Sequence, residues 1–193
     1  MNVDLRGALA QRGALLDGHF RLSSGRHSNR FIQKFRILED PALVEPVARA
    51  IADAFRADAP TVVVSAAVGG IVLGYEVARQ LGTKAIFVEK ENGVATLRRS
   101  FTLTPQDRAL VVEDVVTTGL SVHEVVDVVR ASGAQVVGIG VIVTRGDGAL
   151  DFARDGGIRT HALLDLPIVS YEASECPQCR AGEAITDPGS RRA

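Results

Sequence analysis

Apolar residues follow two different rhythms along the 193-residue chain. Short runs rich in Val and Ile are typical of strands buried on both faces of a parallel sheet. Between them, apolar residues return every three or four positions, the spacing of a helix with one buried face. The predicted strands are 61–64, 83–88, a run beginning at 109, 135–144 and 159–164, and the predicted helices are 40–57, 71–81 and 120–132. This alternation predicts an α/β fold, a mostly parallel sheet flanked by helices.

The N-terminal part of the chain does not follow this alternation of strands and helices. Segment 18–33 is rich in Ser, Gly and Arg between apolar positions, which predicts a strand, a loop and a second strand, with a solvated turn as the alternative. We expect one structural domain with an N-terminal part (1–36), an α/β core (37–170) and a C-terminal tail (171–193). Residues 3–16 predict a short amphipathic helix whose inward positions are Leu5, Ala8, Leu15 and Leu16.

The stretch 109–122, ALVVEDVVTTGLSV, carries the most chemistry. An apolar run ends in Glu113 and Asp114, and a loop rich in Thr and Gly then leads into a helix. Unpaired backbone N–H groups and the helix dipole make such a junction an anion site. Two adjacent carboxylates would repel a phosphate, so they suit a neighbouring polyol or a bridging Mg²⁺. The stretch therefore predicts a phosphorylated sugar as ligand; an ordinary buried strand whose acids cap a turn is the alternative.

Two local signals refine this interpretation. Ser121 followed by Glu124 has the spacing of a capping box, which would fix the start of the helix. The chain has no G-x-x-x-x-G-K-[ST] and no G-x-G-x-x-G after a strand, so the P-loop and dinucleotide-binding motifs fit worse.

Three other predicted strand ends carry groups that suit a ligand. Gly69 and Gly70 open the helix after strand 61–64, Lys90 follows strand 83–88, and Arg145 follows strand 135–144. The carboxyl ends of parallel strands share one edge of the sheet, where α/β proteins bind their ligands. Glycine lets the backbone approach a ligand closely, and a strand-end arginine is well placed to pair with a carboxylate. The alternatives are a structural glycine pair, a solvated lysine and a surface arginine.

Composition and charge narrow the class of protein. Apolar residues make up 46% of the chain, and no run approaches the roughly eighteen residues needed to cross a bilayer. A net charge of -1 argues against a general basic surface for nucleic acid. Residues 1–16 lack the apolar region of a signal peptide, so we expect a cytoplasmic protein with no membrane or nucleic-acid partner.

The motif Cys176-Pro177-Gln178-Cys179 stands outside the phosphate interpretation. Two cysteines with no disulfide framework agree with a reducing compartment. One C-x-x-C supplies only two of the four ligands of a structural zinc site. A redox motif would need to open a helix beside a strand, and the Asp-Pro-Gly at 187–189 predicts a loose chain end instead. A metal shared between two subunits stays open, and the cysteines have no assigned role.

Segment 109–122 resembles the signature of the type I phosphoribosyltransferases, with Glu-Asp where many members have Asp-Asp. The resemblance implies that Glu113 and Asp114 hold the ribose hydroxyls of 5-phosphoribosyl 1-diphosphate (PRPP) and, with Lys90, form the catalytic set. Gly69 and Gly70 would bind the pyrophosphate arm, Lys90 would contact PRPP, and Mg²⁺ would be held mainly through PRPP with no direct protein ligand. The 5′-phosphate would be wrapped by Val115, Val116, Thr117, Thr118, Gly119, Leu120 and Ser121.

A second segment narrows the resemblance to the orotate phosphoribosyltransferases. Their N-terminal hood is reproduced by Gly18, Phe20, Leu22, Ser24, Gly25, Arg26 and Ser28. This likeness implies a homodimer that transfers phosphoribose from PRPP to orotate, giving orotidine 5′-monophosphate and pyrophosphate in pyrimidine biosynthesis. Arg145 would grip the orotate carboxylate, and Thr117 would supply a second contact to the base.

The chain departs from the family pattern at three places. Ser23 stands where the hood often has a lysine, and Gly69 aligns with a lysine of the pyrophosphate loop. Segment 91–100 is short and lacks the His of the family's mobile loop, so Arg98 or Arg99 would replace the missing cation. The alternative is that Phe101, Leu103 and the charges around them simply form a hairpin strand. The short loop keeps open a PRPP-sensing regulator that has lost catalysis. A phosphoribosyltransferase for another base is the other alternative, which Arg145 disfavours.

Overall fold

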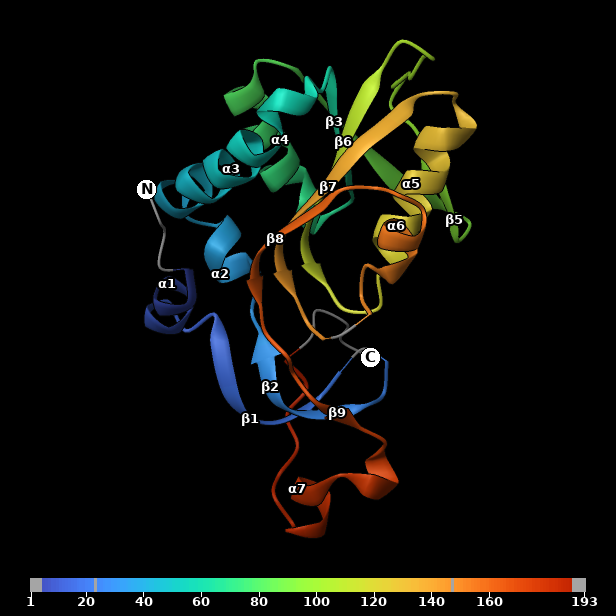
Figure 1. Ribbon diagram of the computed structural model, residues 1–193. Helices are drawn as coiled ribbons and strands as arrows, with labels where there is room; N and C mark the ends of the chain where they lie inside the picture. The colour runs from blue at the N-terminus through green and yellow to red at the C-terminus, as the bar shows by residue number, and fades with distance from the viewer. Residues whose placement is uncertain (1–4, 23, 147, 189–193) are drawn as a thin grey trace.

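The computed structural model describes residues 5–22, 24–146 and 148–188. Its larger sheet has six strands in the order β5-β4-β3-β6-β7-β8, all parallel except β5, which runs antiparallel to β4 (Figure 1). The strands are β3 (Val62–Ala66), β4 (Lys84–Glu91), β5 (Val94–Leu97), β6 (Arg108–Val116), β7 (Gln135–Thr144) and β8 (Thr160–Asp165). The predicted mostly parallel sheet is confirmed, and β5 is an additional edge strand.

Helices cover both faces of this sheet (Figure 1). The helices are α3 (Pro41–Phe55), followed by the 3-10 turn η1 (Arg56–Asp58), and α4 (Gly69–Leu81) on one face, with α5 (Leu120–Ala131) and α6 (Asp151–Asp155) on the other. Alternation along β3 explains this layering, because Val63 packs in the cluster beneath α3 and α4, whereas Val62 and Val64 pack beneath α5. No helix in the described part of the chain has the length and apolar character needed to cross a membrane.

Helix α3 shows how the sequence sets one of these elements. Asp40 caps the first turn by accepting a hydrogen bond from the backbone N–H of Ala42 at 2.9 Å. Pro41 occupies the first helical position, where a missing N–H leaves no bond unmade. The helix packs closely on β7 because Gly138 leaves room for it: a Cβ there would lie 2.2 Å from the ring of Phe55.

A smaller sheet of three antiparallel strands, the hood sheet, lies at one end of the core (Figure 1). Its strands are β1 (Leu15–Arg21), β2 (His27–Ile32) and β9 (Ser170–Tyr171). The strand–loop–strand prediction for 18–33 is therefore confirmed.

The N-terminal helix is shorter than predicted. α1 (Leu5–Gln11) ends before Leu15 and Leu16, which open β1 and pair with Ile32 and Phe31. Residues 3–4 and the side chain of Ala8 lie outside the described residues. A second short helix, α2 (Phe35–Leu38), was not predicted and links the hood sheet to α3.

The C-terminal tail packs on the hood sheet as far as Asp187, which pairs with Arg21, so the expectation of a loose end at 187–189 is wrong for Asp187; Gly189 lies outside the described residues. Strand β9 pairs with β2, and the predicted boundary between residues 170 and 171 falls inside β9. The 3-10 turn η2 (Ala173–Glu175) and α7 (Pro177–Arg180) follow, and Thr186 then forms a parallel bridge with Phe20 of β1. The first and last parts of the chain thus build one layer together.

Candidate active site

The two acids predicted to hold a sugar lie at the end of β6, in the middle of the larger sheet. Asp114 is 1% exposed and Glu113 is 7% exposed. Asp114 Oδ1 accepts a hydrogen bond from the backbone N–H of Val115 at 2.6 Å, and Glu113 Oε1 accepts one from that of Asp114 at 3.1 Å. These bonds fix both carboxylates at the strand end, as an ordered binding site requires.

Lys34 reaches the same acids, which the sequence did not reveal. Its Nζ lies 2.9 Å from Asp114 Oδ2 and 3.1 Å from Oδ1. The lysine follows the hood strand β2 directly and precedes α2. Its ammonium also fills the space beside Gly69, because a Cβ on that glycine would lie 2.7 Å from Nζ and 2.1 Å from Asp114 Oδ2. A cation from another part of the chain therefore stands beside the position where relatives were expected to carry a lysine.

The acid pair carries less charge than its two carboxyls would have in water. Burial, and then the charge of Asp114, raise the pKa of Glu113 to about 8. At neutral pH Glu113 therefore keeps its proton, next to the Asp114 carboxylate that the Lys34 ammonium faces. This charge state lowers the repulsion that two ionised carboxylates would exert on a phosphorylated ligand.

The loop after the acids surrounds a small open pocket, lined by Glu113 and by residues 115–122. Thr117 and Thr118 are exposed at its rim, and Gly119 lies beneath them. Gly119 has φ +77°, and a Cβ there would lie 2.2 Å from the carbonyl oxygen of Ala149, so both its backbone conformation and its packing need glycine. The pocket opens at the N-terminus of α5, where free N–H groups favour an anion.

The capping-box prediction is wrong. Gly119 is the N-cap of α5, so Ser121 lies inside the first turn and caps nothing. Glu124 instead accepts a hydrogen bond from Lys90 Nζ at 2.8 Å.

Arg145 lies beside the loop on the neighbouring strand. Its backbone N–H donates to Val116 O at 2.8 Å, which places it directly alongside Thr117. Among the described residues, its buried Nε has no hydrogen-bond partner, and burial lowers the pKa of Arg145. A guanidinium N–H left unpaired in a partly buried position is a ready donor for an incoming anion. Asp147, two residues further on, lies outside the described residues.

The three cations predicted on segment 90–99 do not line the pocket. Lys90 pairs with Glu124, Arg99 pairs with Glu89 at 2.8 Å, and Arg98 lies 3.5 Å from Glu91. The segment is a hairpin: β4 continues to Glu91, turns at 92–93 and returns as β5. The alternative of a hairpin strand around Phe101 and Leu103 is wrong in its position, because the returning strand is β5 and residues 101–104 form no strand.

Among the residues that the structure describes, Lys34 is the cation in contact with the acids, and the sequence analysis did not predict it. A lysine flanked by Gln and Phe after a short strand has no distinctive spacing. It is recognised only in the folded structure, where the segment after β2 lies against the end of β6. The hood position expected to carry a lysine, Ser23, lies outside the described residues.

Comparisons with known proteins place this fold and site in a class. The model of the phosphoribosyl transferase domain matches residues 35–153, from α2 through the acids to α6. The chain belongs to the phosphoribosyltransferase family.

Within that family, the relatives are orotate phosphoribosyltransferases. The chain is 51% identical over 180 residues to the enzyme of Pelotomaculum thermopropionicum, covering 93% of each chain. It is 47% identical over 190 residues to that of Chlorobaculum parvum, covering 98% of this chain and 96% of the other. The crystal structure of orotate phosphoribosyltransferase from Aeropyrum pernix superposes with a TM-score of 0.72 at 30% identity, covering 84% of this chain and 93% of that one.

Proposed function

We propose that this chain transfers the phosphoribosyl group of PRPP to N1 of orotate, releasing orotidine 5′-monophosphate and pyrophosphate in pyrimidine biosynthesis. The proposal rests on one observation: groups that suit a phosphorylated sugar and a group that suits a carboxylate lie side by side at the C-terminal edge of the sheet. A buried acid pair and a loop that opens a helix lie at the end of β6, and the Arg145 guanidinium, with an unpaired N–H, follows directly after β7. The orotate phosphoribosyltransferases among the relatives support this substrate pair.

The loop and the acids bind different parts of the phosphorylated sugar. The N–H groups at the start of α5 and the hydroxyls of Thr117, Thr118 and Ser121 bind the 5′-phosphate. Glu113 and Asp114 bind the ribose hydroxyls and position C1′ at the strand edge. As the bond to pyrophosphate breaks, C1′ gains positive character, and the negative charge of the acid pair stabilises it. The backbone of Gly69 and Gly70 contacts the pyrophosphate arm, and the Lys34 ammonium beside Gly69 supplies a positive charge to it.

The residues at the pocket fit Mg²⁺ brought in by the substrate. Glu113 and the loop hydroxyls offer the hard oxygen atoms that Mg²⁺ prefers. Asp114 is already engaged by Lys34 and by the Val115 N–H, so the protein supplies no complete cage and the ion would be held mainly through PRPP. When bound, Mg²⁺ neutralises part of the charge on the leaving pyrophosphate.

The base site is built around Arg145. Its guanidinium pairs with the orotate carboxylate, and Thr117 contacts the ring from the adjacent strand end. Orotate N1 is acidic enough to need no strong general base, so we assign Glu113 and Asp114 to positioning and electrostatics. Uracil and the purines lack a carboxylate and would leave the guanidinium unpaired.

Lys90, Arg98 and Arg99 remain predicted substrate contacts. Each side chain is about half-exposed and paired with a surface glutamate, so a phosphate group can compete for it. We propose that Lys90 exchanges Glu124 for PRPP when the substrate binds. The homodimer and the cytoplasmic location also remain predictions that rest on the resemblance.

One assay tests the proposal against its alternatives. The purified protein is mixed with Mg²⁺, PRPP and orotate, and the fall in orotate absorbance is followed; parallel reactions contain uracil, adenine or guanine. We expect turnover of orotate alone. Turnover of another base but not orotate would overturn the base assignment. PRPP binding without turnover of any base would favour a regulator that has lost catalysis.

A further inference from the structure

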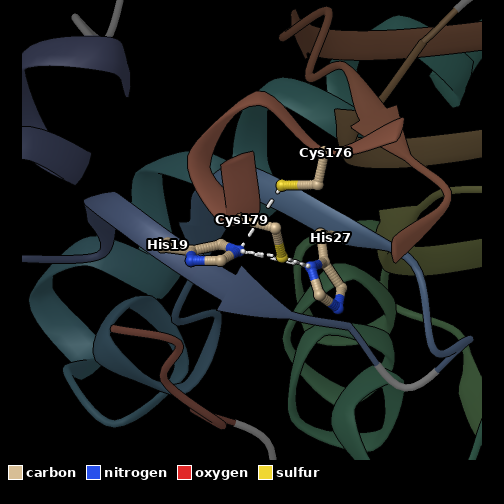
Figure 2. Close-up of side chains that lie close together, drawn as sticks. All are labelled: His19, His27, Cys176 and Cys179. Carbon is tan, nitrogen blue, oxygen red and sulfur yellow. Dashed lines mark hydrogen bonds between the residues drawn. The ribbon is translucent and has the colours of Figure 1, made fainter. Parts of the chain in front are cut away.

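Four side chains from the two ends of the chain converge where the tail packs on the hood sheet (Figure 2). We call His19, His27, Cys176 and Cys179 the hood–tail cluster. The histidines belong to β1 and β2, and the cysteines flank the start of α7, up to 160 positions away in the sequence. The four potential ligand atoms lie within 4.8 Å of one another.

The spacing of these atoms matches a tetrahedral metal site. Ligands about 2.0–2.3 Å from a tetrahedral zinc ion lie roughly 3.3–3.8 Å from one another. His19 Nε2 lies 3.2 Å from His27 Nδ1, 3.5 Å from Cys176 Sγ and 3.6 Å from Cys179 Sγ. His27 Nδ1 lies 3.2 Å from Cys179 Sγ. These four separations are close to the edge lengths of a coordination tetrahedron around zinc.

The ring of His19 is oriented as in a metal ligand. Its Nδ1 lies 3.0 Å from the backbone carbonyl oxygen of Glu183. A carbonyl oxygen only accepts hydrogen bonds, so Nδ1 carries the proton and Nε2 presents a lone pair to the cluster. Metal-bound histidines are commonly held in this way, with the second ring nitrogen donating to a carbonyl.

Burial and charge favour a divalent cation over an empty cluster. His19 is 5% exposed, His27 is 7% exposed and Cys176 is fully buried, whereas Cys179 faces the surface and leaves an entry path. Both cysteines are free thiols. Without a cation, two sulfur atoms and two ring nitrogens share one small space with few protons to satisfy their lone pairs. Two thiolates with one divalent ion are neutral overall, which lowers the cost of burial.

We propose that the hood–tail cluster binds one Zn²⁺ ion with tetrahedral Cys₂His₂ coordination. A set of two sulfur and two imidazole ligands without an open position is typical of structural zinc. The single C-x-x-C therefore finds its two missing ligands within the same chain, in the histidines of the hood. This inference does not depend on the proposed enzymatic reaction.

The ion would fasten the tail to the hood sheet. Neighbouring contacts already join the same two segments: Gln178 Nε2 donates to Gly18 O at 3.2 Å, and Thr186 N donates to His19 O at 2.8 Å. Two ion pairs at the surface, Arg21 with Asp187 and Arg26 with Glu172, also link the segments but contribute little on their own. A metal bound by both segments would make the hood and the tail one cooperative unit.

Metal analysis of the purified full-length protein is the first test. We expect about one zinc per chain after gel filtration, as a closed four-ligand site retains its ion. Cys176→Ser and His19→Gln should lose the metal, whereas His123→Gln, which changes an exposed histidine on α5, should keep it. Another transition metal in stoichiometric amount would overturn the zinc assignment. Zinc retained in the ligand variants would overturn the site.

A second test uses the wild-type chain and does not depend on how the variants fold. Zinc is removed with a chelator and replaced with Co²⁺, and the visible spectrum is recorded. We expect the intense d–d bands of a tetrahedral ion together with a thiolate-to-cobalt charge-transfer band. A weak octahedral spectrum, or a Cys176–Cys179 disulfide in the protein as purified, would overturn the proposal. Hydrogen exchange should then rise in β1, β2 and residues 170–188 after zinc removal, and stay unchanged in β6 and β7.

Discussion

The pocket at the end of β6 takes its lining from residues 113 and 115–122, whereas the hood–tail cluster takes its four side chains from positions 19, 27, 176 and 179. In the first region, a strand, a loop and a helix start follow one another in the chain and define the site locally. In the second, two strands and a returning tail must fold together before any of the four atoms meet.

The difference shows which parts of a site a sequence can display. A contiguous phosphate loop has a recognisable order of residues because each serves a local purpose, such as the positive φ of Gly119. The cluster has only half of a motif, and its other ligands resemble ordinary residues of a strand. Lys34 is an intermediate case. It contacts Asp114, which belongs to the contiguous motif, but it comes from a distant part of the sequence.

Asp114→Asn should produce the largest loss in the local site. The change removes the charge that faces Lys34 at 2.9 Å and the negative charge that stabilises C1′. We expect kcat/KM to fall about a hundredfold or more. Asp127→Asn, an exposed change on α5, is the control and should keep wild-type activity.

A double-mutant cycle identifies the part that Lys34 plays. Lys34→Met should also lower kcat/KM, and the double variant Lys34→Met/Asp114→Asn should lose less than the product of the two single losses. Independent, multiplicative losses would contradict the pairing of these two residues.

Gly69→Ala should have a smaller but clear effect. The new Cβ would lie 2.1 Å from Asp114 Oδ2 and would displace the carboxylate or the Lys34 ammonium. We expect kcat/KM to fall about tenfold, in keeping with the usual cost of overpacking. Gly70→Ala is the matched comparison, since its Cβ would lie no closer than 3.1 Å to Ser65 Cβ and 3.2 Å to Glu113 Oε1, and it should lose less. Equal losses would show that the close contact with Asp114 and Lys34 is not the cause.

Glu113→Gln should change the pH dependence more than the rate at neutral pH. The folded pKa of about 8 lies above the ordinary 4.5, so the folded chain binds more protons between these values. Wild-type stability should therefore fall as pH rises through about 8, and the KM for PRPP should rise as the second carboxylate ionises. The Gln variant has no proton to lose at this position and should lack both changes. Thermal unfolding and KM measurements from pH 6 to pH 9 would contradict this if the two proteins behaved alike.

Arg98→Ala and Arg99→Ala should have the smallest effects. Both side chains lie at the surface and pair with glutamates of β4, so neither change should lower Tm measurably. If one of them faces the pyrophosphate, its removal lowers kcat severalfold. Arg49→Ala, an exposed ion-pair change on α3, is the control. Wild-type kcat in both variants would remove these arginines from the active site.

Much of the core was predictable because its signals are local. β7 has the predicted bounds 135–144, because a long apolar run with polar residues at both ends is readily assigned as a buried strand. The acids and the loop were also found, because a strand end and a helix start leave few conformations between them.

The remaining features depend on contacts that no local pattern records. Leu15 and Leu16 have helical spacing but extend β1, because pairing with β2 buries them better than a longer α1. The order of the tail depends on β9, which is only two residues long and stable only beside β2. Lys90 lies at the C-terminal end of β4, as predicted. Its side chain, however, pairs with Glu124 of α5, a contact that the sequence pattern does not indicate.

The KM for orotate in Arg145→Gln decides between orotate and the other bases. We propose that the Arg145 guanidinium pairs with the orotate carboxylate beside the PRPP loop. We expect the KM for orotate to rise about tenfold or more, the usual cost of a lost charge-assisted hydrogen bond, with the KM for PRPP unchanged. Arg154→Gln, an exposed change on α6, should leave both values unchanged. An unchanged KM for orotate in the Arg145 variant would contradict the account.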